Sequence, residues 1–308
     1  MAKKDFKLTN LEQVREFGNI EFLAKQLVEG FITGLHRSPF HGFSVEFAEH
    51  RLYNTGESTR HIDWKVYAKT DRLFIKRYEE ETNLRCQLLV DISSSMYYPR
   101  QNQGKLTFST LAAAALAYML QKQRDAVSLC TFSDKIELHT QTRSTPSHLH
   151  KIFLRLEELL QDKDKQEGQK TSVAETIHKI ADKVSRRSLV IIFSDMFENQ
   201  DNNQAIFSAL QHLKHNQHEV LLFHVTDKKT EEDFEFEERP HEFIDLESGE
   251  KIRLQPSQIK SYYQQRVKSY YKELKLKCGQ YKIDFIEADI GMGFDQILHA
   301  YLVKRGKM

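Results

Sequence analysis

Five residues with carboxylate or hydroxyl side chains stand beside predicted strand ends or helix starts: Asp91, Ser93, Ser95, Thr171 and Asp195. Asp91 and both serines follow the apolar residues 88–90. Asp195 lies shortly after a second apolar run, 189–193. Carboxylates and hydroxyls are hard oxygen ligands that suit Mg2+, which keeps some of its waters. The pattern indicates a magnesium site with a position left open for a carboxylate of another protein.

A purely local role is the alternative for the same residues. Ser and Thr are favoured at helix N-termini and Asp in turns. In that interpretation Ser93 and Thr171 cap helices and Asp91 lies in a turn. Spacing alone leaves both interpretations open. We also expect Asp91 at a surface edge, where replacing it costs little stability.

From residue 84 onward, short apolar strands alternate with amphipathic helices. Strands are predicted at 86–90, 126–132, 135–142, 189–193, 219–225 and 283–288. Helices are predicted at 107–123, 147–160, 173–185, 203–215, 257–277 and 294–303. This alternation predicts an α/β fold with a doubly wound, mostly parallel sheet flanked by helices. Ligands bind beyond the carboxyl ends of strands in such sheets, so the five oxygen-bearing residues are expected at one edge.

Two stretches depart from this rhythm. Residues 1–83 combine helical spacing with short segments rich in aromatic and β-branched residues, so a small helical and strand-rich N-terminal region is predicted. Residues 84–308 then form the α/β domain. Within it, the acidic stretch 230–254 is predicted to be an exposed insertion with a hairpin around Ser248-Gly249.

The oxygen-bearing motif resembles the metal-ion-dependent adhesion site (MIDAS) of von Willebrand factor A domains. The likeness comprises, in chain order, Asp91-x-Ser93-x-Ser95, Thr171 and Asp195. It implies that the two serines and the threonine offer hydroxyls to the metal, and that the two aspartates act directly or through water. The implied ion is Mg2+, with Mn2+ or Ca2+ as alternatives.

A second resemblance covers the region before this motif. Its segments are His36-Arg37-Ser38-Pro39, the run from Gly42 to Tyr53, Gly56 with Arg60, Ile62-Asp63-Trp64, Ala68 to Asp71, and Glu79 to Thr82. They resemble the DUF58 family, in which this signature precedes a von Willebrand A-like domain. Glu57 stands where many relatives carry Asp, which keeps the charge. The resemblance implies a partnership with MoxR-type AAA+ ATPases, with such proteins as adaptors that assemble or activate others.

Charged residues of the N-terminal region leave two structural interpretations. They pair into a salt-bridged interface with the α/β domain, or they form a partner-binding or regulatory surface. Trp64 is expected to anchor a core. The charged residues are Glu46, Glu49, Arg51, Arg60, Asp63, Arg72, Arg77 and Glu79 to Glu81.

Composition and charge argue against several classes of protein. The chain has 45 Lys plus Arg and 44 Asp plus Glu, a formal net charge of +1, which argues against a basic nucleic-acid-coating protein. Its longest apolar run, 111–120, is far shorter than the roughly 20 residues of a membrane-spanning helix. The first residues lack a signal peptide's apolar core. Three widely spaced cysteines fit a reduced, cytoplasmic protein.

Catalytic motifs are weak in this sequence. Gly168-Gln169-Lys170-Thr171 lacks the second glycine of a phosphate-binding loop. Phosphoryl transfer with Mg2+ and Asp91 is the remaining enzymatic alternative, although Ser93 stands where a second Asp is expected. The basic stretch 260–282 also carries an apolar helical stripe, so it is expected to be the solvated face of a surface helix rather than a nucleic-acid site.

We therefore predict a non-enzymatic protein-interaction module that captures an acidic residue of a partner through a bound metal ion. Neither nucleic-acid binding nor direct membrane insertion is expected. The structural alternative is a scaffold protein whose site no longer binds metal.

Overall fold

The structure is a computed structural model of the 308-residue chain. It describes residues 19–35, 50–53, 64–76, 84–99, 104–161, 173–196, 203–245 and 249–306. Contacts divide the chain into two compact units. One contains most of helix α2 (Ile20–Leu35) and the chain from Leu84 onward, and the other lies within Thr33–Asn83.

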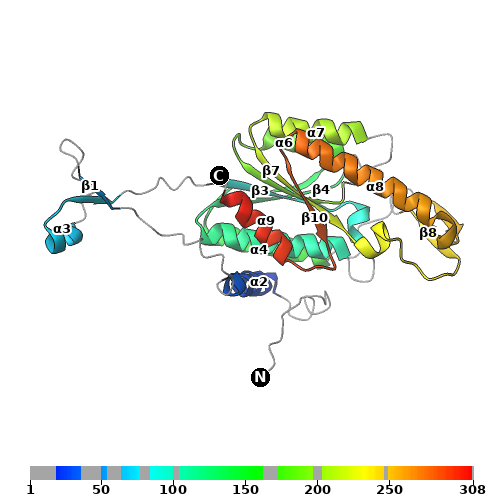
Figure 1. The fold of residues 1–308 in the computed structure, drawn as a ribbon, viewed down its shortest axis with the longest axis horizontal. Helices are drawn as coiled ribbons and strands as arrows, with labels where there is room; N and C mark the ends of the chain where they lie inside the picture. The colour runs from blue at the N-terminus through cyan, green and yellow to red at the C-terminus, as the bar shows by residue number, and fades with distance from the viewer. Residues whose placement is uncertain are drawn as a thin grey trace, which may run out of the picture. The chain divides into compact units, whose positions relative to one another are not determined.

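Six strands form the central sheet, in the order β10-β7-β6-β3-β4-β5 (Figure 1). Five of them are parallel to their neighbours, and the edge strand β5 pairs antiparallel with β4. The predicted α/β fold with a doubly wound, mostly parallel sheet is thus confirmed. The strands are β3 (Arg85–Asp91), β4 (Ala126–Phe132), β5 (Ile136–His139), β6 (Leu189–Ser194), β7 (Glu219–Thr226) and β10 (Asp284–Asp289).

Helices cover both faces of the sheet (Figure 1). One layer contains α2, α4 (Gly104–Lys122), α5 (Pro146–Gln161) and α9 (Asp295–Arg305). The opposite layer contains α6 (Val173–Lys183), α7 (Asn203–His215) and α8 (Pro256–Gln280). In the described part of the chain, no helix has both the length and the apolar character to cross a membrane.

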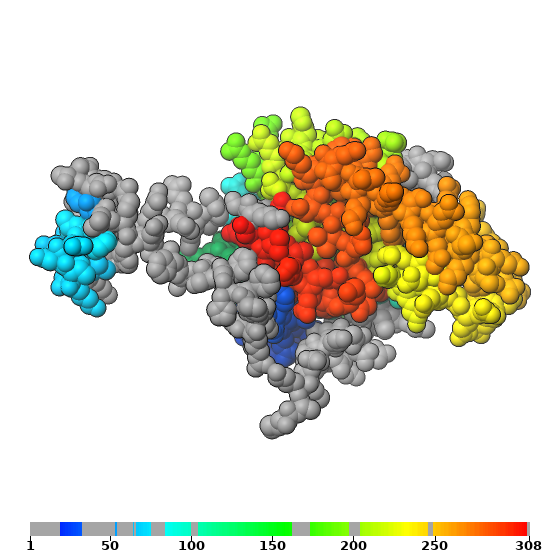
Figure 2. Space-filling model, viewed as in Figure 1, coloured from blue at the N-terminus to red at the C-terminus, as the bar shows by residue number. Residues whose placement is uncertain are grey.

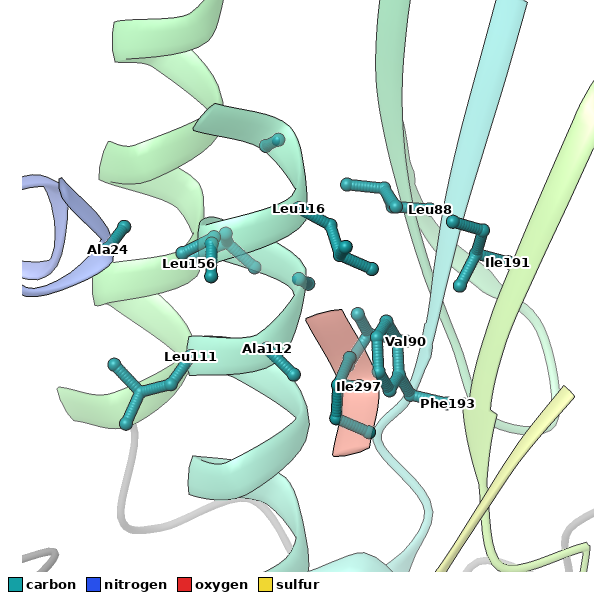
Figure 3. Close-up of a cluster of buried hydrophobic side chains, with 14 of the residues drawn as sticks. Ala24, Leu88, Val90, Leu111, Ala112, Leu116, Leu156, Ile191, Phe193 and Ile297 are labelled. Atoms are coloured by element: carbon teal, nitrogen blue, oxygen red, sulfur yellow. The ribbon is translucent and has the colours of Figure 1, made fainter. Parts of the chain in front are cut away.

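Helix α4 is buried almost all round because it lies between the sheet and other helices. In Figure 3, its Leu116 points toward Leu88 of β3, whereas Leu111 points away from the sheet. Leu88 belongs to the cluster on this face and Leu89 to the cluster on the other face, as the two-residue period of a strand requires. Burying a leucine side chain contributes about 1.5–3 kcal/mol. Because alanine side chains are small, the Ala-rich sequence of α4 permits close packing on two sides.

The sheet has a topological switch point beside its central strand. From β3 the chain proceeds to β4 and β5 on one side, and then crosses over to β6 on the other side of β3. Crossovers that leave in opposite directions open a crevice at the carboxyl ends of the two strands, where α/β sheets bind ligands. Asp91 ends β3, and Asp195 follows β6 directly. The fold thus brings these two aspartates to the switch point.

The predicted insertion contains a hairpin, as expected. The π-helical turn η5 (Lys228–Glu232) precedes strands β8 (His241–Ile244) and β9 (Lys251–Leu254), which pair antiparallel. Phe234 packs against Tyr263 of α8, with ring centroids 4.6 Å apart. Figure 2 shows the yellow segment after β7 and the orange α8 packed together. The insertion therefore has an aromatic contact with the domain.

The smaller unit contains β1 (His50–Leu52), α3 (Trp64–Thr70) and β2 (Phe74–Lys76), with β1 and β2 antiparallel. Trp64 is 62% exposed and contacts Tyr67 edge to face, so the prediction that it anchors a core is wrong. Most of the charged residues predicted to form an interface lie outside the described residues.

Helix α2 corrects the predicted domain division. Helical spacing grouped it with residues 1–83, but it packs with the sheet unit. The Ile20 backbone N–H donates to Glu157 Oε1 of α5 (2.8 Å), and Leu23 and Val28 are buried in the cluster that includes α4 and α5. An apolar helix face needs a partner surface, and the outer side of α4 and α5 supplies one.

Candidate metal centre

Asp91 is held rigidly at the end of β3. Its Oδ1 accepts the Ser93 backbone N–H (2.8 Å), and its Oδ2 accepts the Ser194 hydroxyl (2.6 Å). The first contact is the side-chain-to-backbone turn that Asp favours, so the local interpretation of Asp91 is correct in part. The residue is 0% exposed, which contradicts its expected place at a surface edge. The neighbouring strand β6 covers Asp91, and Ser194 at the end of β6 donates the hydrogen bond to its Oδ2.

Ser93 and Ser95 bring two hydroxyl oxygens together. The Ser93 and Ser95 hydroxyls hydrogen-bond each other, with their Oγ atoms 3.1 Å apart, at the start of the short 3-10 helix η2 (Ser94–Tyr97). Ser93 occupies the N-cap position, but its side chain makes no capping hydrogen bond. The capping interpretation of Ser93 is therefore wrong. Ser93 is buried and Ser95 is half-buried, so part of Ser95 is accessible to solvent.

Asp195 lies next to Asp91 because it follows β6, the strand that pairs with β3. It is 3% exposed, and its backbone carbonyl accepts the Nε2–H of His224 from β7 (2.9 Å). Ser194 hydrogen-bonds both Asp91 and the Met196 backbone N–H, which fixes the loop after β6. The Tyr270 hydroxyl of α8 donates to the Met196 carbonyl on the same loop.

A lysine that the sequence pattern did not single out completes the centre. Lys105, in the first turn of α4, is 1% exposed, and its Nζ lies 2.7 Å from Asp195 Oδ2. The same ammonium contacts Glu231 Oε1 of η5 at 2.5 Å. The insertion thus supplies a carboxylate to the centre. Helix α4 begins at Gly104 and not at residue 107 as predicted, so the sequence pattern did not place Lys105 in its first turn, where a positive charge is unfavourable.

Burial shapes the electrostatics of the cluster. Burial, followed by the negative charge of Asp195, raises the pKa of Asp91 from 3.8 to about 7, although hydrogen bonds from Ser194 and Ser93 oppose the shift. Burial alone would lower the pKa of Lys105, but Asp195 and Glu231 outweigh it and raise that pKa above its usual range. The ammonium is therefore charged, and the centre as a whole favours additional positive charge.

Thr171, the remaining predicted ligand, lies outside the described residues. The structure brings together the other four predicted residues: Asp91, Ser93, Ser95 and Asp195. In the ranges that the structure describes, no group of three or more His, Cys, Asp or Glu side chains is placed to hold a metal ion. A metal here would therefore depend on hydroxyls as well as carboxylates.

The residues present fit a small divalent cation. Neighbouring oxygens of an octahedral Mg2+ shell lie about 2.9 Å apart. The 3.1 Å between Ser93 Oγ and Ser95 Oγ is close to that value. Two buried carboxylates next to the hydroxyls supply negative charge, and burial, followed by the charge of Asp195, raises the pKa of Asp91 to about 7. The donor set is thus suited to a hard cation.

His224 makes the stability of this centre dependent on pH. Its ring is buried and contacts Tyr271 and Phe285. Burial lowers its pKa from 6.5 to about 4 despite the neighbouring Asp195. Between these values the unfolded chain binds more protons than the folded chain, so stability falls as the pH falls.

We expect His224→Gln, which keeps a donor for the Asp195 carbonyl, to remove this loss. Between pH 7 and pH 5, wild type should lose about 2 kcal/mol more than the variant. Urea unfolding of both proteins at the two pH values measures this difference, and titration of Asp91 cancels because both proteins contain it. An equal loss in both proteins would show that His224 is not the group responsible.

Comparison with known proteins agrees with the resemblance found in the sequence. The family described as "Protein of unknown function DUF58" matches residues 49–273, which is most of the chain. The chain belongs to the DUF58 family. The predicted DUF58 membership is thereby confirmed.

The curated relatives that this DUF58 chain matches are described as uncharacterized proteins. It is 24% identical over 176 residues to the uncharacterized protein Rv1480 of Mycobacterium tuberculosis and, equally, to the uncharacterized protein Mb1516 of Mycobacterium bovis. Each alignment covers 57% of this chain and 55% of the relative. The chain thus spans about half the length of the curated relatives it matches.

Two solved structures are also similar to this chain. The conserved hypothetical protein BatB of Bacteroides thetaiotaomicron is 12% identical, with a TM-score of 0.41, and the match covers 73% of this chain and 100% of BatB. An aerotolerance-related membrane protein of Bacteroides fragilis is 13% identical, with a TM-score of 0.42 and the same coverages.

Proposed function

We propose that this DUF58 protein is a non-enzymatic protein-interaction module with a MIDAS-type centre for Mg2+, or for Mn2+ or Ca2+ in its place. The observation that supports the proposal most directly is the pair of hydroxyl oxygens 3.1 Å apart beside buried Asp91 and Asp195. Capping does not account for this pair, since Ser93 makes no capping bond. The arrangement lies at the switch point of the sheet, where α/β folds bind ligands.

Each residue of the centre has a defined task in this proposal. Asp91 holds the loop after β3 through its bond to the Ser93 N–H, and Ser194 holds Asp91 in place. Ser93 and the half-buried Ser95 supply two hydroxyl oxygens that lie 3.1 Å apart. A Mg2+ ion bound here with an open coordination position would attract a carboxylate oxygen of a partner protein. The partner is therefore expected to present an acidic side chain.

Asp91 is better suited to positioning than to phosphoryl transfer. Both of its oxygens accept hydrogen bonds, and the side chain is fully buried. A nucleophile must instead have an oxygen free to approach the substrate. These contacts favour the interaction module over the enzymatic alternative.

The partner proposed from family resemblance is a MoxR-type AAA+ ATPase, with this chain as a cytoplasmic adaptor. Support for the compartment comes from three free, buried cysteines, Cys86, Cys130 and Cys278, which fit a reducing environment. A scaffold that works without metal is the second candidate. The two differ in whether partner capture depends on the hydroxyl pair.

The Ser93→Ala variant should distinguish the metal-dependent module from the metal-independent scaffold. We expect the variant to lose partner affinity at least tenfold in Mg2+, because one hydroxyl ligand is gone. The matched control is Ser133→Ala, which removes a hydroxyl from the loop after β4, where Ser133 donates to Asp134. Binding is measured between immobilised protein and the purified MoxR-type ATPase from the same genome, in Mg2+ and in EDTA. If all three proteins bind the ATPase as tightly in EDTA as wild type does in Mg2+, the result would support the metal-independent scaffold.

A further inference from the structure

Lys105 is an internal cation at the candidate metal centre. Its ammonium is withdrawn from solvent, with 1% of the residue exposed, and contacts Asp195 Oδ2 at 2.7 Å. Burying an ammonium is costly unless it is paired, and the first turn of a helix adds an unfavourable dipole. The position of Lys105 is therefore stable only because carboxylates surround it. In the structure described here, this lysine neutralises one of the predicted metal ligands.

Glu231 gives the same ammonium a second partner. Its Oε1 lies 2.5 Å from Lys105 Nζ, and its Oε2 accepts the Asp227 backbone N–H (2.8 Å). Thr230 Oγ1 donates to Asp227 Oδ2 (2.8 Å), which braces the same turn. Glu231 is thus fixed by its own turn independently of Asp195. Lys105 can keep an ion pair with Glu231 if Asp195 turns to another cation.

The summed charge of the ionisable groups at the centre is also consistent with a divalent cation. Three carboxylates, those of Asp91, Asp195 and Glu231, accompany one ammonium. When all four groups are ionised, their charges sum to minus two, which is the charge that one divalent cation neutralises. The pairing of Lys105 with two carboxylates therefore leaves room for a divalent ion while competing with it for Asp195.

We propose that Lys105 is a built-in competitor that lowers the affinity of the centre for divalent cations, and that Glu231 receives its ammonium when a cation takes Asp195. This inference rests on the proposed metal centre and adds its regulation. Both are positioning residues, because each acts on the metal through Asp195. The proposal predicts opposite effects for the two side chains. Removing the lysine strengthens metal binding, and removing the charge of Glu231 weakens it.

Mn2+ binding to the full chain tests both effects. Free Mn2+ is counted by electron paramagnetic resonance during titration of wild type, Lys105→Met and Glu231→Gln. We expect at least tenfold tighter binding for Lys105→Met, because a like charge next to the ion is gone. For Glu231→Gln we expect at least threefold weaker binding, because Lys105 is left with Asp195 as its one charged partner. The matched control is Lys304→Met, whose lysine bridges Glu219 and Asp284 away from the centre.

Opposite shifts cannot come from general unfolding, which would weaken binding in both variants. Circular dichroism before each titration identifies an unfolded variant, and Glu231→Gln retains the buried Lys105–Asp195 pair if Lys105→Met does not fold. Mn2+ affinities equal to wild type in both variants would overturn the competitor role and leave the metal centre standing. Absence of Mn2+ binding by wild type and by folded Lys105→Met would overturn the metal centre together with this inference.

Discussion

Lys105→Met is expected to lower the free energy of unfolding of the metal-free protein by about 3–5 kcal/mol. The ammonium is buried between Asp195 and Glu231, at 2.7 Å and 2.5 Å. Methionine fills a similar volume but removes the ammonium that contacts the buried Asp195 carboxylate. Urea unfolding in EDTA measures the loss. Addition of Mg2+ should then restore stability to this variant more than to wild type, since the ion supplies the missing charge.

Lys304→Met is the matched control for this experiment. Lys304 also bridges two carboxylates, Glu219 and Asp284, but these are about half exposed, with side-chain exposures of 47% and 49%. Its replacement should cost about 1 kcal/mol or less, and Mg2+ should not change that cost. If both variants lose the same stability and Mg2+ changes neither loss, the proposed role of Lys105 beside Asp195 and Glu231 would be contradicted.

Asp91→Asn is expected to stabilise the metal-free protein at pH 8, by about 4 kcal/mol. The folded-state pKa of Asp91 is raised from 3.8 to about 7, so the fold disfavours the ionised form. At pH 8 the carboxylate is charged in both the folded and the unfolded chain, and the full cost is present. Asparagine mimics the protonated side chain and removes that cost. Below pH 7 the wild-type side chain is itself protonated in the fold, so the gain should shrink toward pH 4.

Urea unfolding in EDTA at pH 8 and pH 5 measures this effect, and the same variant should lose Mn2+ binding. Asp289→Asn is the control, because Asp289 also ends a strand and accepts a backbone N–H two residues later, from Gly291 (3.0 Å). That side chain is only half-buried, so its change should stay within about 0.5 kcal/mol. A less stable Asp91→Asn at pH 8 would show that its hydrogen bonds outweigh the cost of its charge.

Local periodicity predicted the elements of the sheet domain well. Strand 126–132 and helix 203–215 were predicted with the bounds that the structure has, because each is a clear apolar pattern flanked by polar residues. Parallel pairing followed from the alternation of strands and helices. These patterns depend on neighbouring residues, which a sequence displays directly.

Contacts between distant residues were harder to predict. The Lys105–Glu231 pair joins residues 126 positions apart, and nothing in the local pattern of either residue names its partner. The exposure of Trp64 and the packing of α2 likewise depend on which surfaces meet in the fold. Asp91, Ser93, Ser95 and Asp195 were predictable as a group because strand ends of a parallel sheet share an edge.

The most direct test of the central claim is anomalous diffraction from crystals grown in Mn2+. If the metal centre is as proposed, we expect an anomalous peak within bonding distance of both Ser93 Oγ and Ser95 Oγ, with Lys105 paired to Glu231. Saturating Mn2+ without a peak at the two hydroxyls, and with Lys105 still bound to Asp195, would contradict that proposal.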